Sequence, residues 1–289
     1  MVGLEQLTAL DLYLWFGHGQ TVAETLDLSQ STVSRQARAA MRVFGLGCST
    51  GGGHRALIGD QTLLLAERRV HQVARLRGMA PLRLEATYCA GPWFAPYLPP
   101  GWLTSRFDMA GMARPLQLLG ERVIDAWIGS YQPDLPDPDD PRFWVIDLLR
   151  QPVHLLASPS HPLAGERRLS PGDLHRFPSL ALPDGWFPRT EALLRAQGLW
   201  KDPVTLQRYD PASWEGRCSD EVTLTYGHSL TEALQPGTVR LDWDLGHQTG
   251  DALVVRRDLG DEPAIQQLVE RLSQGARRIA AGFADVQAA

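Results

Sequence analysis

The sequence predicts an α/β fold in which a helical N-terminal region precedes two α/β lobes. Apolar residues in the first 78 positions recur at the three- and four-residue spacing of amphipathic helices. From residue 82 onward, short apolar or alternating runs are interleaved with helical stretches, the pattern of strands and helices that share a sheet. The chain has 289 residues, which is enough for two or three domains.

Charge is distributed unevenly along this chain. The net charge is −5, but residues 1–78 hold eight arginines against six acidic residues, a balance of +2, so the remainder carries −7. A basic N-terminal module on an acidic body suits nucleic-acid binding by the first part only.

Other features of the composition exclude several classes of protein. We expect neither a secretory signal nor a membrane span, because no window holds the 18 or more apolar residues that a span requires. The three cysteines, Cys48, Cys89 and Cys218, indicate neither a disulfide framework nor a zinc site. We therefore expect a cytoplasmic protein without metal or cofactor.

Residues 20–44 predict two short helices joined by a turn. The first covers residues 21–26 and the second residues 30–42, with Ser29 as the N-cap of the second. One face of the second helix is apolar and comprises Val33, Ala37, Ala40 and Phe44. The opposite face carries Ser31, Arg35, Arg38 and Arg42. Such a face suits a groove lined by phosphates and base edges, although a solvated basic helix has the same pattern.

The run LDLSQSTVSRQ at residues 26–36 resembles the helix-turn-helix of LysR-type transcriptional regulators. The resemblance implies binding to double-stranded DNA. Arg35, Arg38 and Arg42 would hold phosphates or guanine edges, and the shorter contacts would come from Gln30, Ser31, Thr32, Ser34 and Gln36.

After the second helix the chain departs from the family pattern. The family's Leu-Glu pair is replaced by Ala40-Met41. The glycine-rich residues 45–54 occupy the place of the family's wing, and this layout makes His54 and Arg55 candidates for phosphate contacts. A disordered loop tip is the alternative.

Two further helices accompany this motif. Residues 4–18 predict a helix that packs behind the second helix of the motif. Residues 60–77 predict a helix whose apolar positions follow a coiled-coil seam comprising Leu63, Ala66, Val70 and Val73. A protein that recognises palindromic DNA needs two recognition helices, so we expect a homodimer or a homotetramer built on this seam. Burial of the seam against the chain's own body is the alternative.

The rest of the chain predicts strands and helices in alternation. Strands are expected at residues 82–86, 122–130, 179–182 and 204–209, in two pieces within 143–157, and at 239–244 and 252–256. Helices are expected from Gly91, and at residues 112–119, 169–175, 188–197 and 262–283. Residues 221–228 and 229–234 stand in place of a glycine-rich helix and strand of the LysR family. The sequence HPLA at residues 161–164 is a second motif that resembles the LysR family.

The resemblance implies three parts. They are a winged helix-turn-helix at residues 1–58, a dimerising linker helix at 59–78, and an effector-binding domain at 79–289. The last would have the two-lobed architecture of periplasmic binding proteins. Lobe I would cover about 79–157 and 245–289, and lobe II about 158–244, with a ligand cleft between them.

A small-molecule effector is expected where strand ends face this cleft. Lobe I would contribute Thr87, Tyr88, Cys89, Ala90, Gly129, Ser130 and Tyr131. Lobe II would contribute Trp186, Tyr226 and His228. Free amides at the helix that begins at Gly91 favour an anionic ligand, and the aromatic residues hint at a flat one. Loops of this composition are also ordinary turns.

The expected function is sequence-specific DNA binding modulated by this effector, with RNA polymerase as a further partner. One alternative is a stand-alone solute-binding protein with a degenerate DNA-binding head. The other is an enzyme related to the α/β hydrolases, since residues 227–231 match a nucleophile elbow except for its last glycine. We expect no enzyme and no catalytic residues, because no Ser/His/Asp constellation accompanies that run.

Overall fold

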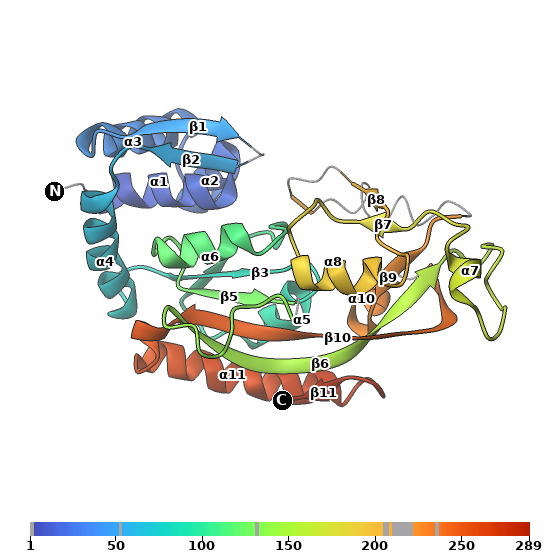
Figure 1. Cartoon of the computed structure of the whole chain (residues 1–289). Coiled ribbons are helices and arrows are strands. Elements are labelled where there is room, and N and C mark those ends of the chain that lie inside the picture. Colours follow the sequence, from blue (N-terminus) through green and yellow to red (C-terminus); the bar gives the residue numbers. More distant parts are fainter. Residues whose placement is uncertain (1–2, 52–53, 131–132, 205–207, 210–221, 235–236) are drawn as a thin grey trace. The chain divides into compact units, whose positions relative to one another are not determined.

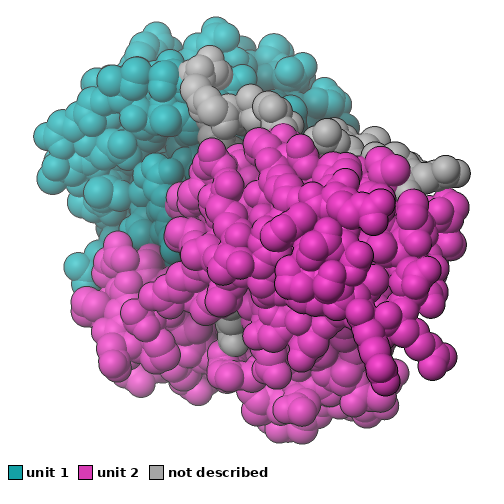
Figure 2. Space-filling view, turned by 45° about the vertical axis from the view of Figure 1, so that its right-hand side comes forward, with its two compact units in different colours: residues 1–85, 100–106, 114–127 teal, residues 86–99, 107–113, 128–289 magenta. Residues whose placement is uncertain are grey.

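The computed structural model describes residues 3–51, 54–130, 133–204, 208–209, 222–234 and 237–289. The chain forms two compact units (Figure 2). Unit 1 comprises Met1–Glu85, Pro100–Arg106 and Arg114–Trp127, and unit 2 comprises Ala86–Pro99, Phe107–Ala113 and Ile128–Ala289. No described helix is both long and apolar enough to cross a membrane.

Unit 1 begins with the predicted winged helix-turn-helix. Its helices are α1 (Leu4–Phe16), α2 (Gly19–Leu26) and α3 (Gln30–Val43). The antiparallel hairpin of β1 (Gly47–Gly51) and β2 (His54–Ile58) forms the wing (Figure 1). Successive turns of α1 and α3 contribute to one core, which also includes Leu46 and Leu64 and comprises Leu7, Leu10, Leu14, Ala37, Ala40, Leu46 and Leu64. The expected apolar face of α3 is confirmed, because Val33, Ala37 and Ala40 are all buried.

Helix α4 (Thr62–Leu76) exposes apolar side chains and buries mostly polar ones. Its predicted apolar seam is exposed, with 70% of Leu63, 63% of Val70 and 48% of Val73 accessible to solvent. Its opposite face is buried and mostly polar, and comprises Leu64, Arg68, His71, Gln72 and Arg75. The seam therefore does not pack within its own chain.

The buried face of α4 is held by ion pairs inside unit 1. Arg75 forms a two-pronged ion pair with Asp125, in which its Nε and Nη2 each lie 2.8 Å from a carboxylate oxygen. Arg68 Nε lies 2.8 Å from Asp11 of α1, and its Nη1 lies 3.0 Å from Glu121. Buried charges are tolerated when each has an opposite partner and well-aligned hydrogen bonds. These pairs fix the linker helix to the first strands of the α/β region.

The remaining elements of unit 1 begin the α/β fold. Strand β3 (Leu82–Ala86) pairs in parallel with β4 (Trp102–Thr104), and the strand order is β5-β3-β4. Helix α6 (Ala113–Gly120) precedes β5 (Ala126–Gly129). The predictions at residues 82–86 and 112–119 are confirmed to within a residue. Strand β4 was not predicted, because its three residues follow directly on Pro99-Pro100-Gly101.

Unit 2 is built on two long antiparallel strands, β6 (Phe143–Ala157) and β10 (Val239–Arg256) (Figure 1). We predicted two strands in each of these segments, and that was wrong. Irregularities that looked like strand ends are taken up by register shifts, such as the one between Asp244 and Gln248. Pro152, which lacks an N–H donor, lies opposite Gln248 within the continuous ladder. Strand order in this unit is β11-β6-β10, with β9 (Thr225–Gly227) also on β6 and β11 at Gln287–Ala288.

Short elements and one long helix complete unit 2. They are α5 (Gly91–Phe94), η1 (Ala95–Tyr97), α7 (Pro171–Leu174), β7 (Leu180–Ala181), α8 (Pro188–Arg195), β8 (Asp202–Pro203), α10 (Ser229–Leu234), η3 (Arg257–Leu259) and α11 (Pro263–Ala280). The N-terminus of α7 has a capping box, in which Ser170 and Asp173 bond each other's backbone N–H groups. The strand predicted at residues 204–209 lies partly outside the described residues.

Candidate DNA-binding surface and effector pocket

The three arginines predicted to contact DNA share one surface of unit 1. Arg35, Arg38 and Arg42 are exposed on α3. Together with Met41 and the start of the wing they line an open hollow, whose other residues are Leu46, Gly47 and Cys48. Helix α3 contains no acidic residue, so its exposed side has only positive charge. A concave basic surface formed by a helix and a wing can grip a phosphate backbone.

The shorter candidates for DNA contacts lie near the start of α3. Gln30 and Ser31 are exposed, and Thr32 and Ser34 are half-buried. The Ser29 hydroxyl accepts a hydrogen bond from the Thr32 amide at 3.2 Å, as predicted for an N-cap.

Three candidates differ from this arrangement. The Oε1 of Gln36 is buried and has no hydrogen-bond partner, so this atom faces protein. The Arg55 guanidinium lies over the Tyr13 ring, 4.3 Å from its centre. This contact holds the Arg55 side chain against helix α1. The side chain of His54 lies outside the described part of the chain.

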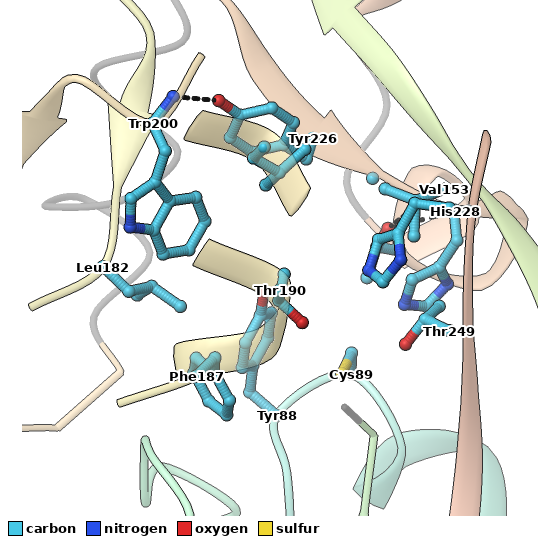
Figure 3. A pocket seen from close by; sticks show the side chains of 14 residues that line it. Tyr88, Cys89, Val153, Leu182, Phe187, Thr190, Trp200, Tyr226, His228 and Thr249 are labelled. Carbon is cyan, nitrogen blue, oxygen red and sulfur yellow. Dashed lines mark hydrogen bonds between the residues drawn. The ribbon is translucent and has the colours of Figure 1, made fainter. Parts of the chain in front are cut away.

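Unit 2 contains a pocket between its two long strands and the elements of the second predicted lobe (Figure 3). Its lining residues come from the turn after β3, from β6, β9, β10, α10, α8 and the segments before and after α8. They are Tyr88, Cys89, Val153, Leu182, Phe187, Thr190, Leu194, Trp200, Tyr226, Gly227, His228, Thr231, His247 and Thr249. The wall is mainly aromatic and aliphatic, with a few polar groups that can orient a ligand.

Four of the predicted effector residues line this pocket: Tyr88, Cys89, Tyr226 and His228. Two others, Thr87 and Ser130, lie in a hydrogen-bonded group that also includes Cys89. Ala90 and Gly129 are buried without lining the pocket. Trp186 packs beside Gly111, outside the lining residues, and Tyr131 lies outside the described residues.

Sequence reasoning missed the contribution of the long strand β10. His247 and Thr249 line the pocket, and Asp251 follows them on the same face because side chains alternate along a strand. The alternation of three polar residues in the run HQTGD was the available signal. The predicted strands at residues 239–244 and 252–256 leave this stretch between them, so the prediction does not include it.

A buried carboxylate lies beside the pocket. The Ser130 hydroxyl donates to Asp251 Oδ1 at 2.6 Å, while Asp251 Oδ2 is buried without a partner. Burial raises the pKa of Asp251 to about 6, and a smaller opposing effect comes from the Ser130 hydrogen bond. Burial also raises the pKa of the nearby Cys89 thiol to about 12, and the Asp251 charge adds to this shift.

The two histidines of the pocket are uncharged at neutral pH. Burial lowers the pKa of His228 to about 3, and it also lowers the pKa of His247. Within the described residues, neither lysine nor arginine lines the pocket. The anionic ligand expected at the turn before Gly91 therefore finds no positive charge there, and α5 is only one turn long.

Metal and enzyme chemistry find no support in this arrangement. The described residues contain no group of three His, Cys, Asp or Glu side chains that could hold a metal ion. Ser229, in the run that resembles a nucleophile elbow, donates to Asp285 at 2.5 Å and accepts from Arg240 at 2.8 Å. The Ser229 hydroxyl therefore belongs to an ion-pair network of Asp285 and Arg240, and these hydrogen bonds do not pair it with a general base.

Solved structures of LysR-family regulators are similar to this chain. A full-length OxyR variant from Pseudomonas aeruginosa is 16% identical with a TM-score of 0.57, and the match covers 96% of this chain and 95% of that one. CbnR in complex with its target DNA is 14% identical with a TM-score of 0.53, covering 94% and 99%. Full-length BenM is 18% identical with a TM-score of 0.51, covering 98% and 99%. At these identities the likeness shows the shared fold.

The sequence itself matches one family model. No curated protein sequence matches the chain. The family model for the LysR substrate binding domain matches residues 103–277, which is more than half of the chain. Members of this family are transcriptional regulators rather than enzymes, and the helix-turn-helix, the linker helix and the pocket described above fit that class. The chain belongs to the LysR family of transcriptional regulators.

Proposed function

We propose that this protein regulates transcription by inserting α3 into the major groove of a specific operator. The observation that carries the proposal is the hollow at α3, where Arg35, Arg38 and Arg42 are all exposed and face away from the buried stripe of the helix. The arginines supply the contacts to phosphates and guanine edges. Gln30 and Ser31, also exposed at the start of α3, supply shorter contacts that set the register.

The protein acts as a homo-oligomer through the exposed seam of α4. Leu63, Ala66, Val70 and Val73 are all exposed while Arg68 and Arg75 of the same helix are buried. A helix that exposes an apolar stripe and buries two of its arginines has its outer face shaped for another apolar surface. A second copy supplies the same stripe and brings a second recognition helix to the operator.

A small-molecule effector in the pocket of unit 2 modulates operator binding. The pocket volume is about 70 Å³, whereas an engineered cavity that admits benzene measures about 150 Å³. A ring-sized ligand must therefore widen the pocket and shift the elements around it. That displacement couples the ligand to the oligomer, and through it to DNA and to RNA polymerase.

Replacing Arg35 tests the DNA-binding surface. Arg35→Ala should weaken operator binding by about 1–3 kcal/mol without unfolding, because the side chain is exposed. Binding is measured by fluorescence anisotropy on DNA from upstream of the protein's own gene. Arg278→Ala, an equal change of charge at an exposed site on α11, is the control. Equal affinities of the wild type and Arg35→Ala would remove α3 from the groove.

Introducing a charge into the seam tests the oligomer. Val70→Glu should shift the protein to monomers in sedimentation velocity at micromolar concentration, because it places a carboxylate in an apolar contact. The exposed Leu193→Glu in α8 is the matched control and should leave the assembly intact. A wild-type protein that sediments as a monomer would contradict the proposed role of α4.

A further inference from the structure

Among the described residues, several buried side chains in or beside the pocket have polar atoms without partners. They include Oδ2 of Asp251, both polar atoms of Gln151, Nδ1 of His228 and Nε1 of Trp200. Each of these residues is at most 7% exposed. An unpaired buried polar group costs free energy, and folded proteins keep few of them. These groups gather around one cavity, whose lining includes His228 and Trp200 but not Asp251 or Gln151, and they point to a ligand that completes hydrogen bonds there.

The strand register places two of these groups, here called the floor, next to the lining residue Thr249, although neither is itself a lining residue. Thr249, which lines the pocket, lies directly opposite Gln151 in the antiparallel pair of β10 and β6. Asp251 is two residues beyond Thr249 in the same regular stretch, so its side chain is on the same face. Both residues also bond to Ser130. The Thr249 hydroxyl donates to the Ser130 backbone oxygen, and the Asp251 carboxylate accepts from the Ser130 hydroxyl.

The charges around this floor disfavour an anion. The Asp251 carboxylate has a single hydrogen bond from Ser130, and no cation among the described residues neutralises it. The pocket histidines, His228 and His247, are neutral because they are buried. In a region of low dielectric constant, a second negative charge near Asp251 would be repelled strongly. A donor group that passes the lining as the pocket widens, by contrast, would satisfy Asp251 Oδ2 and Gln151 Oε1.

The walls specify the shape of the ligand. Tyr88, Phe187, Trp200 and Tyr226 surround the cavity (Figure 3), and aromatic side chains bind flat rings through stacked and edge-to-face contacts. The Trp200 amide donates to the Tyr226 hydroxyl at 2.9 Å, which holds these two rings in place. Aromatic faces also attract positively charged groups.

We propose that the effector is a planar aromatic molecule without negative charge, which widens the pocket and donates an N–H group to Asp251 and Gln151 behind the lining. The inference rests on the proposed function, because it assigns a ligand class to the effector pocket of that function.

Three probes of one shape and different charge test this inference. Benzoate, benzamide and benzamidinium share a ring and a planar three-atom group, and they carry charges of −1, 0 and +1. Their affinities for the full-length protein are measured by isothermal titration calorimetry at pH 7.5. We expect benzamide and benzamidinium to bind at least tenfold more tightly than benzoate. Benzoate binding as tightly as benzamide would overturn the assigned ligand class and leave an effector pocket in place.

A variant identifies the charge responsible. Asp251→Asn should reduce the preference for benzamidinium over benzoate at least tenfold, whereas the exposed Asp258→Asn should leave it unchanged. An unchanged preference in Asp251→Asn would contradict the role of this carboxylate. If none of the probes binds up to 10 mM, a saturable site for small aromatic donors is absent and the inference fails. The DNA-binding half of the proposed function is measured separately with the Arg35 variant and is unaffected by that result.

Discussion

Two groups of buried charges, one in each unit, have opposite surroundings. In unit 1, Arg75 and Asp125 form a two-pronged ion pair, and Arg68 joins Asp11 and Glu121. In unit 2, the buried Asp251 has only a hydroxyl donor among the described residues, and one of its oxygens has no partner there. Paired charges hold elements together, while an unpaired one costs stability and persists where a ligand can use it. The difference separates structural charges from functional ones.

Breaking a structural pair should produce the largest effect. Asp125→Ala leaves Arg75 buried without its carboxylate partner and should lower the free energy of unfolding by about 3–5 kcal/mol. Asp140→Ala is the matched control, because its Arg142 partner is 71% exposed, and it should cost at most about 1 kcal/mol. Urea denaturation followed by circular dichroism measures both. Similar losses in the two variants would mean that the buried pairs of unit 1 are no more important than surface pairs.

Neutralising the unpaired charge of Asp251 should raise the free energy of unfolding rather than lower it. The pKa of Asp251 is about 6 in the folded protein, against an ordinary value of 3.8. The folded state therefore binds the proton more tightly, and this group lowers stability as pH rises from about 4 to about 6.

Asp251→Asn removes that loss. It should be more stable than the wild type by up to roughly 3 kcal/mol above pH 6, with no gain below pH 4. Thermal unfolding from pH 4 to pH 8 measures the difference. A variant that is destabilised at pH 7 would show that the carboxylate is structural after all, as in unit 1.

An exposed polar contact should have the smallest effect. Ser29 caps α3 through its bond from the Thr32 amide at 3.2 Å. Ser29→Ala should cost about 1 kcal/mol of unfolding free energy, and Ser29→Asp, which retains a capping oxygen, should restore most of it. If both substitutions are neutral, the cap is not formed in solution.

The parts of the fold that depend on local patterns could be predicted from the sequence. Helix α3, its N-cap at Ser29 and the seam of α4 each follow from residues that are close in the chain. The lengths of β6 and β10 could not be predicted, because irregularities such as the one near Asp244 resemble strand ends in a sequence. Only pairing between distant segments shows that each strand is continuous.

The pocket was predicted less completely for the same reason. Tyr88, Tyr226 and His228 follow or end short strands, so their positions could be inferred from the local pattern. Trp200 and Thr249 reach the pocket only through long-range packing. The pairing of Arg75 with Asp125, fifty positions apart, was equally hidden, because a periodicity shows that a helix face is buried but not which residues cover it.

The salt dependence of DNA binding tests the central claim most directly. The claim is that paired recognition helices grip phosphates with the arginines of α3. Purified protein is titrated onto DNA from upstream of its own gene and onto random DNA of equal length, from 50 to 200 mM salt. With about six phosphate contacts in a dimer, affinity should fall roughly 1,000-fold across this range, and specific DNA should bind more tightly throughout. Absence of binding at low salt would contradict the claim and leave a ligand sensor whose head does not bind DNA.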